Sequence, residues 1–99
     1  MKSFSEAAPL QGSSFQVASV QGEPLTLKLT QVQDKGSNEI VEQFSLLLRG
    51  PLNAPLEQGL YRLQHEILGT VDWMIVPVAK DAEGYLYEAV FNLLKNEQS

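Results

Sequence analysis

Apolar and polar side chains alternate along much of this chain, as they do in β-strands that bury one face. In the stretch "PLTLKLTQVQ", threonine and lysine separate three leucines that share one face of an extended strand: Leu25, Leu27 and Leu29. A helix would scatter these leucines around its axis. Val32 breaks the alternation, so a bulge or twist is expected near residues 30–31.

Two more stretches show the same period of two. "QFSLLLR" aligns Phe44, Leu46 and Leu48, and "GYLYEAVFN" aligns Tyr85, Tyr87, Ala89 and Phe91. Each set is expected to face the core of a sheet.

The stretch "VDWMIVPVA" differs because both of its faces are apolar. Val71, Trp73 and Ile75 share one face, but the other face carries Met74, Val76 and Val78. We therefore expect both faces to be covered over part of this strand. Pro77 has no amide hydrogen, so it should mark a bulge, a strand end or an unpaired edge.

Turn-forming residues separate the strands. Breaks fall at residues 21–24, 34–38, 50–59, 66–69 and 81–84, and one further strand is expected near residues 14–20. Ser3 followed by Glu6 matches a capping box, which predicts a short N-terminal helix that Pro9 and Gly12 end.

These elements predict an all-β fold. About six strands with mostly tight connections favour consecutive antiparallel pairing. We expect residues 1–99 to form a single domain, a small antiparallel barrel or barrel-like roll with a short N-terminal helix. A flattened sandwich of two packed sheets is the alternative.

Composition and charge narrow the function. The chain has 99 residues, of which 43% are hydrophobic, and its net charge of −5 comes from scattered acidic residues. No basic cluster is present, so neither nucleic acid nor an anionic membrane surface is an expected partner. The longest apolar run, residues 73–79, is too short to span a bilayer, and residues 1–12 lack the apolar core of a secretory signal. We expect a cytoplasmic protein.

Candidate chemistry is sparse and centres on His65, the only histidine. The chain has no cysteine, which excludes disulfides and thiolate metal sites, and no second histidine or dense carboxylate run supports a metal site. No serine lies in a G-x-S-x-G motif and no glycine-rich nucleotide-binding motif occurs, so no cofactor is expected. A spatial serine–histidine arrangement stays open as a third hypothesis, a small hydrolase centred on His65.

A structural role for His65 is the favoured interpretation. By alternation, Tyr61, Leu63 and His65 share the inward face of a strand, and His65 ends that strand beside the turn of residues 66–69. An imidazole can both donate and accept a hydrogen bond, which suits a hairpin corner. Gln58, Tyr61, His65 and Asn92 are together expected to form a buried or half-buried polar network that fixes hairpin register.

The second half of the chain resembles a family of small bacterial proteins of unknown function. The family pattern is Q-G-x-Y-x-L-x-H, then L-G, then V-P-V, then Y-x-A-x-F-N. The matching positions here are Gln58, Gly59, Tyr61, Leu63, His65, Leu68, Gly69, Val76, Pro77, Val78, Tyr87, Ala89, Phe91 and Asn92. The first half is similar more loosely, through residues 15–17 and "FSLLLRGP". The resemblance transfers no activity, and it implies a link to phage-tail-like assemblies.

Three functions follow in order of preference. The first is a non-catalytic structural or protein-interaction module, with a protein partner or a second copy of the chain. The second is a small-ligand-binding barrel with aromatic residues near its mouth, namely Tyr61, Trp73, Tyr85 and Tyr87. The hydrolase is third, and we expect the protein not to be an enzyme.

Overall fold

The computed structural model describes residues 4–17 and 25–94. A helix of one turn, α1 (Phe4–Ala7), runs into a 3₁₀ turn, η1 (Ala8–Leu10). Six strands follow: β1 (Ser14–Val17), β2 (Leu25–Asp34), β3 (Val41–Gly50), β4 (Gly59–His65), β5 (Gly69–Asp81) and β6 (Gly84–Leu94). The short N-terminal helix is thus confirmed, whereas its predicted cap, Ser3, lies outside the described residues, as do residues 18–20 of the expected first strand.

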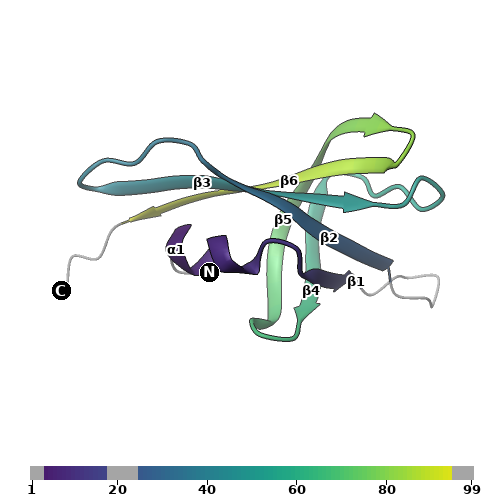
Figure 1. Cartoon of the computed structure of the whole chain (residues 1–99), viewed down its shortest axis with the longest axis horizontal. Helices are drawn as coiled ribbons and strands as arrows, with labels where there is room; N and C mark the ends of the chain where they lie inside the picture. Colours follow the sequence, from purple (N-terminus) through teal and green to yellow (C-terminus); the bar gives the residue numbers. More distant parts are fainter. Residues whose placement is uncertain (1–3, 18–24, 95–99) are drawn as a thin grey trace.

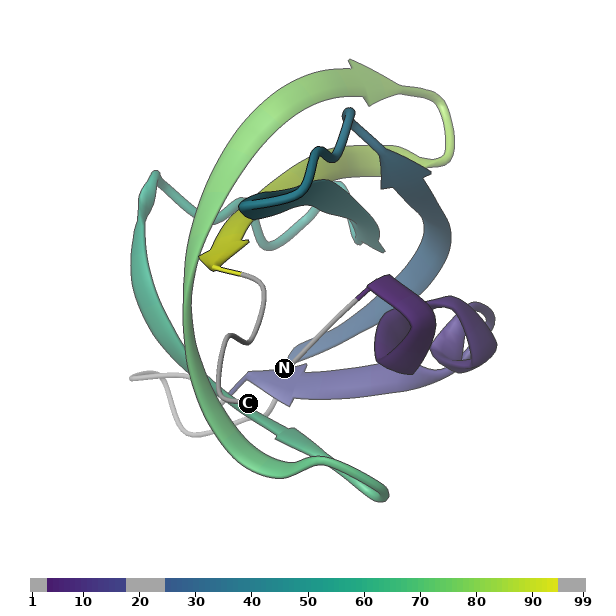
Figure 2. The same ribbon diagram turned by 90° about the vertical axis from the view of Figure 1, so that its left-hand side faces the viewer.

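The strands close into an antiparallel barrel in the order β1-β2-β3-β6-β5-β4. Every neighbouring pair is antiparallel. Figure 2 shows the strands curving around a common interior, with α1 at one side of the ring. The predicted all-β barrel is confirmed, and the sandwich alternative is wrong because one continuous ring replaces two separate sheets.

Two irregularities bend the ring where the sequence predicts them. The β2–β3 register shifts between Leu29 and Gln31, and the β5–β6 register shifts between Pro77 and Ala79. An extra residue in one strand sharpens its bend and local twist, which helps a small sheet to close. Pro77 suits such a position because it has no ladder hydrogen to donate.

The pairing of β6 is uneven along its length. Its pairing with β3 runs from Tyr85 to Leu94, but its pairing with β5 ends at Glu88, opposite Val76. Before Val76, β5 pairs with β4 instead. In Figure 1, β3 and β6 accordingly extend together to the left of the β4–β5 hairpin, which crosses below them. The second half of β6 is therefore bonded to a described strand on one side only.

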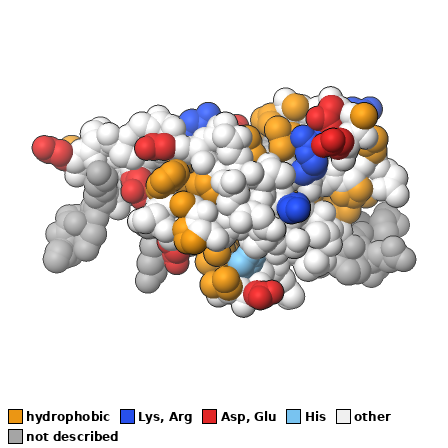
Figure 3. All heavy atoms as spheres, viewed as in Figure 1, with side chains coloured by type: hydrophobic (Ala, Val, Ile, Leu, Met, Phe, Trp, Pro, Cys, Tyr) orange, Lys and Arg blue, Asp and Glu red, His pale blue; other side chains and the backbone are white. Residues whose placement is uncertain are grey.

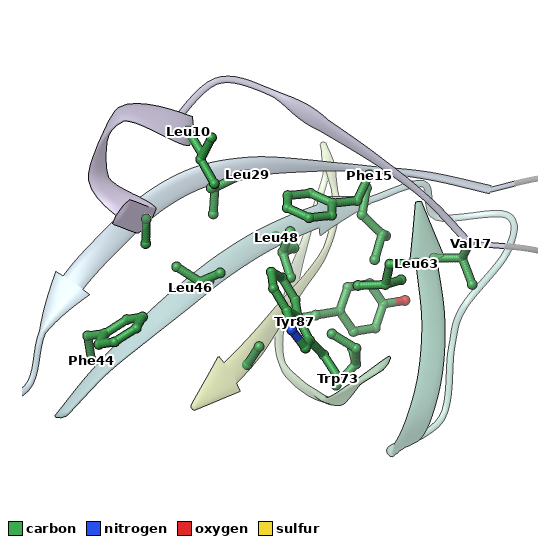
Figure 4. Close-up of a cluster of buried hydrophobic side chains, with 14 residues drawn as sticks. Leu10, Phe15, Val17, Leu29, Phe44, Leu46, Leu48, Leu63, Trp73 and Tyr87 are labelled. Atoms are coloured by element: carbon green, nitrogen blue, oxygen red, sulfur yellow. The ribbon is translucent and has the colours of Figure 1, made fainter. Parts of the chain in front are cut away.

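Most of the core that fills the barrel consists of side chains that alternation predicted to face inward. Figure 4 shows Phe15, Tyr87 and Trp73 pointing toward one another between β1, β5 and β6. The buried hydrophobic residues are Ala7, Leu10, Phe15, Val17, Leu27, Leu29, Phe44, Leu46, Leu48, Leu63, Trp73, Ile75, Tyr87 and Ala89. Such side chains contribute roughly 1.5–3 kcal/mol each when fully buried.

The outer face of β5 corrects one expectation. Met74 is 51% exposed and Val78 is 48% exposed, whereas Val76 between them is half-buried, so the predicted cover over part of this face is wrong at Met74 and Val78. The barrel is one layer of sheet around a core, and among the described residues no second layer lies over the outer face of β5.

Aromatic rings follow one another through the interior. Five successive ring contacts, with centroids 4.5–6.1 Å apart, link Phe4, Phe44, Phe91, Trp73, Phe15 and His65. Trp73 and Phe91 meet edge to face at 5.2 Å where β5 and β6 separate. Aromatic packing thus bridges the two strands at a place where ladder hydrogen bonds do not.

Candidate functional site

His65 occupies the corner where β4 turns into β5. It is the last residue of β4 and pairs with Gly69, the first residue of β5. Alternation points its ring inward beside the buried Leu63, and the residue is only 6% exposed. In Figure 3 the histidine is visible as a small pale-blue area among hydrophobic side chains.

Both nitrogens of the His65 ring are hydrogen bonded. Nδ1 accepts from the backbone amides of Ile67 at 3.0 Å and Leu68 at 3.2 Å. Nε2 lies 2.8 Å from Oγ of Ser13, and the Ser13 hydroxyl donates to the Leu10 carbonyl at 2.5 Å. The ring therefore joins the hairpin turn to the segment between η1 and β1.

This arrangement selects one tautomer. Backbone amides can only donate, so Nδ1 must carry the lone pair and Nε2 must carry the hydrogen. The Ser13 hydroxyl then accepts from His65 and passes its own hydrogen to Leu10. A general base that activates a serine needs the opposite polarity, with the serine donating to the imidazole. In this geometry His65 holds Ser13 in place and does not activate it.

Ser13 is itself fixed to the neighbouring strand. The Ser13 carbonyl accepts from the amide of Leu29 at 2.9 Å, and the Gly12 amide donates to the Leu29 carbonyl at 2.7 Å. Sequence reasoning missed Ser13 because 52 residues separate it from His65 and no motif joins them. The sequence predicted a strand near residues 14–20 but gave no signal that places Ser13 beside His65.

The other predicted network residues lie apart from His65. The Tyr61 hydroxyl donates to the Glu57 carbonyl at 2.6 Å, near the start of β4. Gln58 precedes β4, at the opposite end of the strand from His65, and Asn92 lies on the outer face of β6; both side chains are exposed. Within the described ranges, no hydrogen bond joins these three residues to His65 or to one another. The length of β4 separates Gln58 and Tyr61 from His65, and Asn92 is separated from His65 because its side chain lies on the outer face of the sheet.

The aromatic residues proposed for a pocket mouth are divided between core and surface. Tyr87 and Trp73 are buried, whereas Tyr61 and Tyr85 are half-buried. The Tyr87 hydroxyl oxygen accepts from the amide of Leu56 at 2.9 Å, which ties the loop of residues 51–58 to β6. Burial raises the pKa of the Tyr87 hydroxyl above its ordinary value, although the bond from Leu56 opposes this effect.

Charged side chains pair across strands. Arg62 meets Asp72 at 2.9 Å, Arg49 meets Asp81 at 2.8 Å, and Lys35 meets Glu88 at 3.8 Å. The bond from Arg62 lowers the pKa of Asp72, and the pKa of Asp81 is lowered mainly by the backbone amide of Glu83 and then by Arg49. In the described part of the chain, no group of three or more acidic or histidine residues is placed to hold a metal ion.

The second half of β6 has a described neighbour, β3, on one side only. The Lys35 amide donates to the Gln43 carbonyl at 2.8 Å, so the backbone groups of Gln43 face β2. Backbone direction alternates along a strand, so those of Phe44 face β6 and bond to its partner Phe91. The backbone groups of the residues on either side of Phe91 must then point away from β3.

We call the residues whose backbone groups point away in this segment the free β6 edge: Val90, Asn92 and Leu94. No described strand pairs with them on that side. Val90 is 56% exposed and Leu94 is 75% exposed, so apolar side chains accompany the unpaired backbone. Sequence reasoning missed this edge because alternation locates a strand and its faces but says nothing about which neighbours it pairs with, or for how long.

One family of proteins matches this chain. Residues 3–91 match the family described as "Domain of unknown function (DUF6916)". No curated protein and no solved structure matches the chain. No helix in residues 4–17 and 25–94 is long and apolar enough to cross a membrane. Since the match covers residues 3–91 of a chain of 99 residues, this chain belongs to the DUF6916 family.

Proposed function

We propose that this protein is a non-catalytic interaction module that holds another protein chain by adding a strand to its sheet. The observation that carries the proposal is the free β6 edge, where backbone donors and acceptors have no partner among the described strands. An unpaired strand edge recognises any extended backbone, and flanking side chains supply selectivity. Val90 and Leu94 would supply that apolar contact.

The chemistry at His65 supports the same conclusion. The tautomer that its three hydrogen bonds require cannot take a proton from Ser13, so the ring acts as a connector between segments. The hydrolase hypothesis therefore gains no support from the arrangement of these two residues.

A ligand-binding barrel has less support than an interaction module. Tyr87 and Trp73, two of the four residues proposed for a pocket mouth, pack in the core with Phe15 and Leu63. A barrel of six strands is narrow, and side chains ordinarily fill one of this size.

Site-specific photo-crosslinking in cells tests the proposal. A photoreactive amino acid at Val90 or Leu94 should give covalent adducts with a protein. The same probe at Gln64 should not, because Gln64 is exposed but lies on a strand paired on both sides, opposite Gln16 and Thr70. Equal adduct yields at the edge and at Gln64, or no adduct at either, would count against the interaction role.

A link to phage-tail-like assemblies stays a prediction. Its support is the sequence resemblance alone, and the crosslinking experiment checks it, because the mass of an adducted tail protein differs from that of a second copy of this 11.0 kDa chain.

A further inference from the structure

We propose that the partner of the free β6 edge is a second copy of this chain, joined by antiparallel β6–β6 pairing about a twofold axis at Asn92. This inference rests on the proposed interaction function and specifies its partner. It would join the β2, β3 and β6 strands of two barrels into one continuous sheet of six strands.

The backbone directions of the edge permit this register. Around a twofold axis at Asn92, each Asn92 lies opposite its copy, and each Val90 lies opposite the other chain's Leu94. All three residues direct their backbone groups outward, so every opposed pair can exchange hydrogen bonds in both directions. Moving the axis two residues toward Val90 would require Glu88, whose backbone already pairs with β5.

The side chains of the edge are complementary to themselves in the same register. On the outer face, the exposed Val90 of one copy meets the exposed Leu94 of the other. On the inner face, the half-buried Phe91 meets Leu93. A symmetric interface needs one patch that matches itself, and this segment does so in apolar pairs on both faces.

The charge pattern also favours pairing with another copy. Residues 90–94, "VFNLL", contain no charged residue and no proline. Exposed edges of monomeric proteins ordinarily carry lysine, proline or a bulge that blocks pairing. Two chains that each carry a net charge of −5 repel one another in general, but this uncharged segment brings no like charges face to face.

The expected interface is small. Five residues per chain form only a short ladder, so we expect a weak and reversible dimer rather than an obligate one. Sedimentation equilibrium of the purified chain up to about 1 mM should reveal association, because interfaces of this class bind in the micromolar to millimolar range.

Asn92→Pro is the most direct variant. The Asn92 amide points away from β3, so proline removes a donor from the interface but none from the β3–β6 ladder. We expect at least about tenfold weaker association with an unchanged melting temperature in dilute protein.

Asn92→Asp, which places two carboxylates at the axis, should weaken association by a similar factor, and added salt should restore part of it. Asn92→Thr, an uncharged strand former, is the matched control and should keep the dimer.

Single cysteines test the register, since the native chain has none. Under mild oxidation, Asn92→Cys should cross-link fastest, because it lies opposite its own copy. Val90→Cys and Leu94→Cys should each cross-link more slowly, since each lies opposite the other position. Gln64→Cys serves as the background control.

A chain that stays monomeric up to about 1 mM, or dimers that survive Asn92→Pro unchanged, would overturn the proposal. Faster cross-linking at Val90 or Leu94 than at Asn92 would overturn the register. A monomer whose Val90 probe still captures a different protein in cells would reject self-pairing and leave the interaction function standing. Failure of both experiments would reject the two together.

Discussion

At the scale of single residues, His65 shows how one side chain can connect three segments. Its Nδ1 caps the turn through Ile67 and Leu68, and its Nε2 reaches Ser13, whose hydroxyl continues to Leu10. The two halves of the ring thus have separate structural tasks. Amide side chains can reproduce the halves one at a time, because the asparagine oxygen lies near the position of Nδ1 and the glutamine nitrogen lies near that of Nε2.

Substitution of His65 should separate these tasks. His65→Ala should lower the free energy of unfolding by about 1–3 kcal/mol, because it leaves polar groups without partners at a buried position. His65→Asn keeps an acceptor for the turn and His65→Gln keeps a donor for Ser13, so each should lose less than the alanine variant. Urea denaturation measures all three. An alanine variant as stable as the wild type would contradict the structural role.

Two glycines with positive φ offer a matched test of backbone packing. Gly84 has φ +139° and a Cβ there would collide with the Gly50 carbonyl oxygen, whereas Gly69 has φ +75° and open space around it. Gly84→Ala should cost about 3 kcal/mol or more. Gly69→Ala should cost only the left-handed backbone penalty of about 1–2 kcal/mol. Equal losses in thermal denaturation would show that the contact between Gly84 and Gly50 is not tight.

At the scale of elements, alternation predicted most of the fold. The six strands and the bulge near residues 30–31 follow from the period of two and from the turn residues, and the short helix follows from its capping-box pattern. Pro77 predicted an irregularity of β5, and the structure shows which of the three alternatives it is, a bulge. The sequence could not show whether both faces of β5 are buried, because apolar residues such as Met74 occur on exposed sheet faces as well as on covered ones. The separation of β5 from β6 depends on strand curvature, which no local pattern records.

The site was predictable only in its local part. The position of His65 beside a turn follows from alternation and from Gly69, and the turn bonds to Ile67 and Leu68 follow from that position. Its partner Ser13 depends on closure of the barrel between β1 and β4, a contact between distant parts of the chain.

The buried Tyr87 hydroxyl helps to hold the loop of residues 51–58. Tyr87→Phe removes the acceptor of the Leu56 amide while leaving the ring in the core. We expect a loss of about 0.5–1.5 kcal/mol in the free energy of unfolding, measured with urea at neutral pH. Faster amide exchange at Leu56 should accompany it. No change in either quantity would mean that the bond does not hold the loop.

The same hydroxyl predicts an alkaline loss of stability. Burial raises the pKa of Tyr87 in the folded chain, so the unfolded chain releases this proton first as the pH rises. The contribution of Tyr87 is complete below the unfolded pKa of about 10 and is lost as the pH rises through the folded value. The stability gap between the wild type and Tyr87→Phe should therefore narrow above about pH 10. A gap that widens there would contradict the sign of the shift.

At the scale of the whole molecule, the barrel combines a well-packed interior with strand edges that no described strand pairs, among them the free β6 edge. Aromatic rings and His65 close the core from α1 to the β4–β5 corner. The free β6 edge extends beyond the β4–β5 hairpin and carries exposed apolar side chains. Barrel closure normally removes strand edges, so an unpaired edge that also carries exposed apolar side chains and no charge is a feature suited to binding another chain.

Amide hydrogen exchange along β6, measured by NMR at low and high protein concentration, tests this account most directly. In dilute protein the amides of Phe91 and Leu93 should be protected by β3, while those of Val90, Asn92 and Leu94 should exchange quickly. At high concentration the fast group should become protected and the slow group should stay unchanged. Uniform protection along the strand in dilute protein, or fast exchange at the edge that does not respond to concentration, would contradict the account.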